Sequence, residues 1–169
     1  MTSIEPCEVP LNSFLRRYKD GHGYADCYMV EVKGAITQEQ FVEAFYTSAL
    51  FKLERTMLRY LASRPATDAD ARQLAMGKAT GFSAWRVEAQ SVSELLLADL
   101  TGRTRSWLMV GPGTRPKSTR LYFGSAVLPR KSRGPDKAGM GWPFHALLGF
   151  HRLYSRLLLG AASGRLGTA

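Results

Sequence analysis

The chain has 169 residues, of which 45% are hydrophobic, and it carries a formal net charge of +9 at pH 7. This length suits one globular domain with a sizeable core. The two cysteines, Cys7 and Cys27, are too few for a disulfide framework and are interpreted as free thiols. The first residues lack the pattern of a signal peptide, and no apolar run is long enough to span a membrane, so we expect a cytoplasmic protein.

The positive charge is concentrated in the last third of the chain. Residues 1–100 contain 11 Lys/Arg and 13 Asp/Glu, whereas residues 101–169 contain 12 Lys/Arg and one acidic residue, Asp136. Such an asymmetry is compatible with a surface for nucleic acid or anionic membrane. It is equally compatible with a solvated basic face and a basic loop.

The first half of the chain predicts one strand followed by helices. Residues 1–23 are expected to be irregular because prolines and glycines interrupt them. Residues 24–32 alternate between two faces, as a strand does. Thr37 to Gln40 have the spacing of a capping box, and an apolar stripe runs from there to Tyr60, in one helix or in two that meet at Ser48. A shorter helix follows from Thr67, so two or three helices separate the first strand from the second.

The period then changes to two, which predicts a block of strands. The expected strands cover residues 82–89, 94–100, 106–110 and 120–128, giving five with the first one. Short gaps between them indicate an antiparallel meander. Residues 129–141 are rich in Gly, Pro and basic residues and predict a loop, and Pro143 begins an amphipathic helix that runs to residue 159. Residues 161–169 are expected to form a flexible tail.

Several short motifs occur in an order that resembles a known family. They are Tyr24-Ala25-Asp26, Leu53-Glu54-Arg55, residues 93–97, residues 121–127 and Pro143-Phe144-His145. The series is similar to a bacterial domain family of unknown function, grouped with the helix-grip superfamily of START-type and polyketide-cyclase-like proteins. The resemblance implies an α+β domain over residues 24–160, in which a curved antiparallel sheet wraps around a long C-terminal helix. It also implies an apolar ligand in the cavity between sheet and helix.

The expected function is therefore non-covalent binding of a small apolar or amphipathic molecule. Aromatic and polar residues on the predicted strands and on the last helix are candidates for the pocket wall: Trp85, Glu94, Trp107, Tyr122, His151 and Tyr154. The aromatic residues could equally belong to a plain hydrophobic core. No cofactor and no metal site are expected, because the chain contains none of the familiar nucleotide-binding, hydrolase or zinc motifs.

A first alternative is an enzyme of the cyclase or hydrolase type. It would use His151 on the apolar stripe of the last helix and Glu94 at the start of a strand as acid and base. Each residue also has a structural interpretation, His151 as a core histidine and Glu94 as the partner of Arg86 in a cross-strand ion pair. We expect binding rather than catalysis.

A second alternative is an anion-binding surface in the basic region of residues 115–137. Its candidate residues are Arg115, Lys117, Arg120, Arg130, Lys131 and Arg133. The region has few aromatic residues for base stacking and no nucleic-acid-binding motif, which argues against nucleic acid as the partner. The same charges could steer an anionic ligand to the mouth of a pocket. The oligomeric state has no signal in the sequence.

Overall fold

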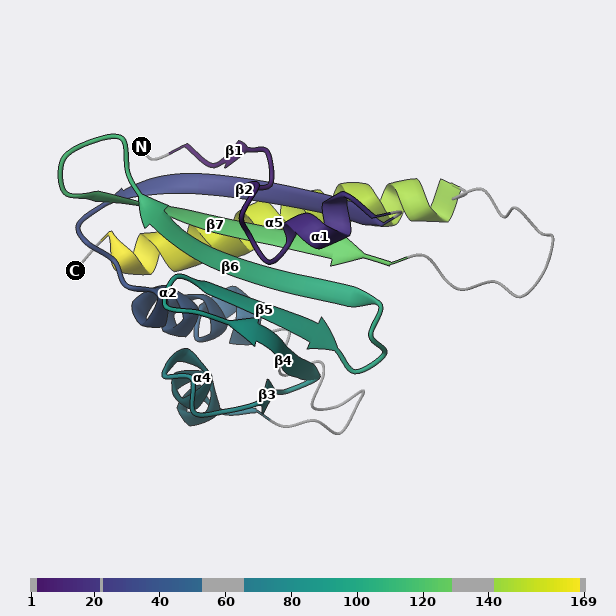
Figure 1. The fold of residues 1–169 in the computed structure, drawn as a ribbon, viewed down its shortest axis with the longest axis horizontal. Coiled ribbons are helices and arrows are strands. Elements are labelled where there is room, and N and C mark those ends of the chain that lie inside the picture. The colour runs from purple at the N-terminus through teal and green to yellow at the C-terminus, as the bar shows by residue number, and fades with distance from the viewer. Residues whose placement is uncertain (1–2, 22, 53–65, 129–141, 168–169) are drawn as a thin grey trace.

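The computed structural model describes residues 3–21, 23–52, 66–128 and 142–167, and for residues 142–151 it describes the backbone alone. In this part of the chain, one curved antiparallel sheet has seven strands in the order β1-β2-β7-β6-β5-β4-β3 (Figure 1). The strands are β1 (Glu5–Pro6), β2 (Tyr24–Lys33), β3 (Gly81–Phe82), β4 (Trp85–Gln90), β5 (Glu94–Asp99), β6 (Thr104–Pro112) and β7 (Ser118–Val127).

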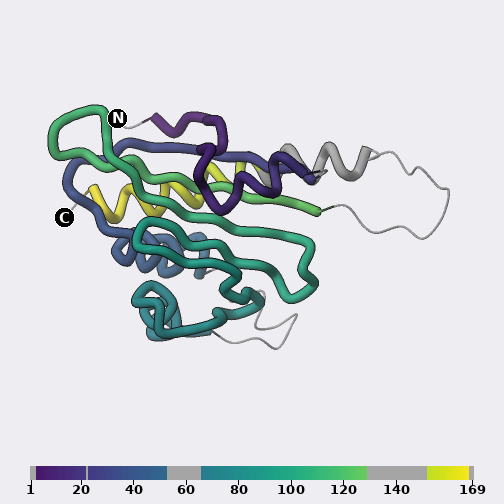
Figure 2. Tube along the Cα trace, viewed as in Figure 1, coloured from purple at the N-terminus to yellow at the C-terminus, as the bar shows by residue number. Residues whose placement is uncertain are grey.

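Helices cover one face of this sheet, called here the inner face. They are α2 (Gln38–Tyr46), α4 (Asp68–Ala75) and the long α5 (Trp142–Leu166), which lies along β2 and β7. The opposite, outer face is covered in part by the N-terminal segment, residues 7–20, which includes the short helix α1 (Arg16–Lys19). Figure 2 shows α5 and this segment on opposite sides of the sheet. The sheet is therefore the middle layer of three.

The helices begin where the sequence predicted. The side chains of Thr37 and Thr67 each accept a hydrogen bond from the backbone N–H three residues on, and both capping boxes are complete. After α2 the chain turns at Ser48 and becomes helical again at residues 49–52, so the apolar stripe is interrupted at that residue. Gly77 has a φ of 70° after α4, a conformation that glycine adopts without strain.

The predicted count of five strands is wrong, because the sheet has seven within the described residues. The single strand expected over residues 82–89 is split into β3 and β4 by a tight turn in which Ser83 has a φ of 55°. The other additional strand, β1, lies in the segment that was expected to be irregular. Each of these extra strands is two residues long, which is too short to produce a visible alternation.

Helix α5 extends to Leu166, seven residues beyond the end that the sequence predicted. Leu158, Leu159 and Ala162 are at most 3% exposed, so the inner side of this last part is packed against the rest of the protein. Burial of that side stabilises a helix in a stretch whose glycines disfavour it. Only tertiary packing, which local sequence does not show, accounts for the additional turns.

Candidate functional site

Glu94 holds the N-terminal segment against the outer face. Its carboxylate Oε2 accepts a hydrogen bond from the backbone N–H of Phe14 at 2.8 Å and another from the indole Nε1 of Trp107, also at 2.8 Å. Glu94 is 8% exposed and Trp107 is fully buried. Within the described part of the chain, the partners of the Glu94 carboxylate are therefore Phe14 and Trp107 rather than the expected Arg86, and both hydrogen bonds are structural.

The structure divides the predicted pocket wall between the two faces of the sheet. Glu94, Trp107 and Tyr122 belong to the outer face, whereas Trp85 and Tyr154 pack against the inner core. His151 lies within α5, but its side chain falls outside the described residues. The sheet thus stands between Glu94 and the helix that carries His151, and the proposed acid–base pair gains no support from this arrangement.

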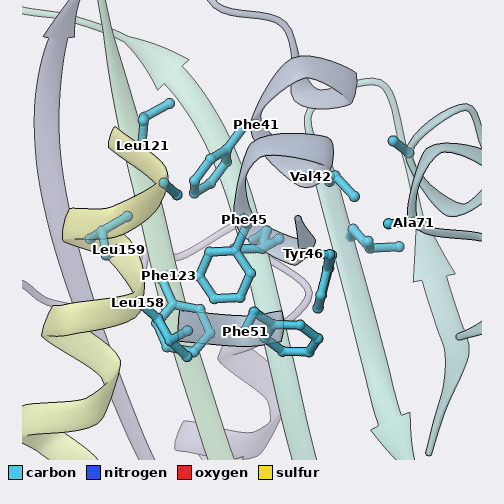
Figure 3. Close-up of a cluster of buried hydrophobic side chains, with 14 of the residues drawn as sticks. Phe41, Val42, Phe45, Tyr46, Phe51, Ala71, Leu121, Phe123, Leu158 and Leu159 are labelled. Atoms are coloured by element: carbon cyan, nitrogen blue, oxygen red, sulfur yellow. The ribbon is translucent and has the colours of Figure 1, made fainter. Parts of the chain in front are cut away.

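Aromatic side chains fill the described part of the inner face. The ring centroid of Phe45 lies 4.8 Å from that of Phe123, 5.2 Å from Tyr46 and 6.1 Å from Phe51. Figure 3 shows this group beside Leu159 of α5. Such tilted and edge-on contacts are the favourable arrangements of packed aromatic rings. A ligand site among the described residues therefore has to lie outside this cluster.

A groove of about 680 Å³ lies at one end of the molecule, where the C-terminal part of α5 meets the end of β2 and the turn before β7. Its apolar wall is made of Ile4, Val32, Pro116 and the glycine face of α5, which includes Gly160 and Gly164. A Cβ atom built on Gly164 would meet no atom within 4 Å, so the groove is open at this point. The edge of β2 on the side of β1 also contributes to the opening, because the two residues of β1 pair with only two residues of β2, Met29 and Tyr28.

Glu31 anchors the charged end of this groove. Its Oε1 accepts hydrogen bonds from the hydroxyl of Ser118 at 2.6 Å and from the backbone N–H groups of Thr114 and Arg115, each at 3.1 Å. Its Oε2 accepts from the hydroxyl of Thr114 at 2.7 Å. These bonds, led by that of Ser118, lower the pKa of Glu31 to about 2, so the carboxylate is charged at neutral pH.

Basic side chains outnumber this one carboxylate around the groove. Lys33 and Arg115 line it, and Arg120 lies beside Glu31 with its Nε 3.7 Å from Oε2. The guanidinium Nε of Arg115 is also 3.7 Å from Glu31, yet the side chain is 76% exposed. Lys33 makes no ion pair with the part of the chain that the structure describes. The rim of the groove therefore has more positive charge than the described residues neutralise.

Part of the predicted basic cluster lies at the charged end of the groove. The structure brings Arg115 and Arg120 to Glu31, and Lys117 occupies the same turn with a φ of 55°. Arg130, Lys131 and Arg133 fall outside the described residues. The turn before β7 is thus the described part of the basic surface.

Most of the groove is not predicted by the sequence. Glu31, Lys33 and Ile4 had no motif to mark them, because the groove joins segments far apart in the chain. A usable signal was the spacing of Gly160, Gly164 and Gly167 in steps of four and three, which places all three on one side of a helix. That stretch was instead assigned mainly to a flexible tail.

Comparisons with protein-family models, with curated proteins and with solved structures found no match for this chain. No helix in the described residues is both long and apolar enough to cross a membrane. Over the same residues, no three His, Cys, Asp or Glu side chains gather in a way that could hold a metal ion. The groove and its charged rim are consequently the features of the described residues that bear on function.

Proposed function

We propose that the protein binds a small amphipathic anion, without covalent chemistry, in the groove between α5, β2 and the turn before β7. The observation that carries the proposal is the combination, in one groove, of an apolar wall and a basic rim. The apolar body of the ligand lies against Ile4, Val32 and the glycine face of α5. Its negatively charged end lies near Lys33 and Arg115.

The size of the groove supports a ligand of this kind. Pockets for small molecules usually measure about 300–1,000 Å³ and combine apolar walls with a few polar groups that orient the ligand. The groove has about 680 Å³, and the glycines of α5 let a ligand approach the helix backbone. A medium-length acyl chain with a carboxylate or phosphate end meets both requirements.

The electrostatics support a negative rather than a positive ligand. Glu31 already accepts hydrogen bonds from the hydroxyls of Ser118 and Thr114 and from the backbone N–H groups of Thr114 and Arg115, so both of its carboxylate oxygens are bonded within the turn. The exposed Lys33 and Arg115 keep donor groups for a ligand. Hydrogen bonds between ionised partners are roughly twice as strong as neutral ones.

We further propose that the chain is a helix-grip domain. The long C-terminal helix beside an antiparallel sheet, and the helices between β2 and β3, support the assignment. In helix-grip proteins the ligand usually lies in the layer between the sheet and the C-terminal helix, and the proposed groove also lies beside that helix. This protein would differ in the position of its site, at the end of α5 rather than above the centre of the sheet, where aromatic side chains pack.

Titration calorimetry with dodecanoate and with the neutral dodecanol tests the proposal. We expect saturable binding of dodecanoate, weakened about tenfold in the double variant Lys33→Gln/Arg115→Gln, while the affinity for dodecanol changes little. Gly164→Leu places a side chain in the groove and should weaken both ligands. Arg103→Gln, an exposed charge removed from another turn, is the matched control. Absence of saturable binding, or binding that neither variant weakens, would refute the proposal.

A further inference from the structure

The two cysteines face each other across the pairing of β1 and β2. The register of these strands matches Glu5 with Met29 and Pro6 with Tyr28, so Cys7 comes opposite Cys27. The backbone N–H of Cys7 donates to the carbonyl oxygen of Cys27 at 2.9 Å, and the two Sγ atoms also lie 2.9 Å apart. Residues opposite one another in such a hydrogen-bonded pair have Cα atoms about 5.5 Å apart, a separation that also suits a disulfide.

The two thiols have different surroundings. Cys27 is 3% exposed within the outer-face core, whereas Cys7 is partly exposed. The hydrogen bond between the two sulfur atoms lowers the pKa of Cys7, and the same bond together with burial raises the pKa of Cys27. The thiolate therefore forms on the accessible sulfur, which is the one that an external reagent can reach.

An open depression of about 550 Å³ leads to this pair. Its lining includes both cysteines, Tyr24, and two basic side chains of α5, Arg152 and Arg156. The Nε of Arg152 donates to the hydroxyl of Tyr24 at 3.2 Å, and Arg156 is exposed. The carboxylate of Asp26 also lines the depression, so its two arginines leave a net positive charge in the opening that leads to the cysteines, which favours a reagent that carries negative charge.

We propose that Cys7 and Cys27 form a dithiol–disulfide site that exchanges with a small anionic disulfide. The thiolate of Cys7 attacks one sulfur of the disulfide, forms a mixed disulfide and releases one thiolate, which takes up a proton. Cys27 then loses its proton and attacks the Sγ of Cys7, which releases the second small thiol and closes the bond between the two strands. The protein loses two electrons and two protons, and one small disulfide becomes two small thiols.

The assignment of roles can be tested with oxidised glutathione on the full chain. In the wild-type protein we expect an internal disulfide that joins tryptic peptides 1–16 and 20–33, with both cysteines protected from alkylation. Cys27→Ser should stop at a stable glutathione adduct on Cys7. Cys7→Ser should react at least about tenfold more slowly, because Cys27 is buried and an external reagent reaches it poorly. These results would be read from intact and peptide masses.

A separate variant tests whether the positive charge of the depression favours an anionic disulfide. Arg156→Gln should slow the reaction with oxidised glutathione about threefold at low salt, and leave that with neutral 2-hydroxyethyl disulfide unchanged. Arg103→Gln should change neither rate. The proposal is overturned if oxidised glutathione leaves both wild-type thiols open to alkylation, if the bond forms between chains, or if Cys7→Ser and Cys27→Ser react at equal rates. Equal slowing of both reagents by Arg156→Gln would refute the preference for an anionic disulfide.

Discussion

The indole N–H of Trp107 donates a 2.8 Å hydrogen bond to the carboxylate of Glu94, and the same carboxylate oxygen accepts the backbone N–H of Phe14. One buried acceptor therefore serves two donors, one on β6 and one in the N-terminal segment. This relationship connects the first part of the chain to the centre of the sheet. The two hydrogen bonds also give Glu94 a structural role that involves no catalysis.

Removal of this acceptor should destabilise the protein. Glu94→Ala leaves the buried indole N–H of Trp107 and the partly buried N–H of Phe14 without their acceptor, and we expect a loss of roughly 2–4 kcal/mol in the free energy of unfolding. Glu94→Gln keeps one acceptor oxygen and should lose about half as much. Urea denaturation provides the measurement, and the exposed Glu5→Gln serves as control. A loss below about 0.5 kcal/mol for Glu94→Ala would contradict the structural role.

Two glycines should respond to alanine in opposite ways. A Cβ on Gly124 would come within 2.5 Å of Leu15 Cδ2 and 2.7 Å of the carbonyl oxygen of Asp26, whereas one on Gly164 would meet nothing within 4 Å. Gly124→Ala should therefore cost about 1–3 kcal/mol. Gly164→Ala should stabilise α5 by about 0.5 kcal/mol, because alanine favours helices. Thermal and urea unfolding would check both, and equal effects would show that the packing around Gly124 is looser than described.

The stability of the protein should depend on the ionisation of Glu31. Its pKa is about 2 in the folded protein, below the value of about 4.3 that an unperturbed glutamate has. A lowered folded pKa adds stability above about pH 4.3, and this contribution disappears as the pH falls toward 2. The advantage of the wild type over Glu31→Gln, measured by urea midpoints, should be constant near neutral pH and shrink in that acidic window. Parallel curves for the two proteins would argue against the network.

Closure of the Cys7–Cys27 bond should stabilise the fold. The two residues are 20 positions apart, and a bond closing a loop of this length contributes about 3 kcal/mol, largely by restricting the unfolded chain. We expect the oxidised protein to unfold at a higher denaturant concentration than the reduced one. The double variant Cys7→Ser/Cys27→Ser should respond to neither oxidant nor reductant. An unchanged midpoint after complete oxidation would mean that the bond strains the folded state.

The features that the sequence predicted correctly are local ones. The alternation along β2, the capping box at Thr37 and the start of a helix at Thr67 depend on residues within a few positions of one another. Alternation also places Glu94 on the same face as Leu96. It cannot show which face α5 will cover, because a period of two tells only which residues of a strand share a face. The absolute side depends on packing between distant elements.

The features that the sequence could not show depend on contacts across the chain. The hydrogen bond from Thr114 to Glu31 joins residues 83 positions apart, and the facing of Cys7 and Cys27 follows from the register of a two-residue strand. The groove is likewise assembled from four separate segments. A single sequence carries no local period for such contacts, so the number of cysteines was evident while their proximity was not.

The attachment of the N-terminal segment has a consequence for the biogenesis of the protein. Phe14 precedes its acceptor Glu94 by 80 positions, so it leaves the ribosome long before that carboxylate exists. Since chains are made at about 5–20 residues per second, the segment waits for seconds while β5 and β6 are still being synthesised. The segment that carries Phe14 thus docks only after β5 and β6 have been made, and until it docks, the newly made Trp107 and its neighbours would be an apolar surface that chaperones can recognise.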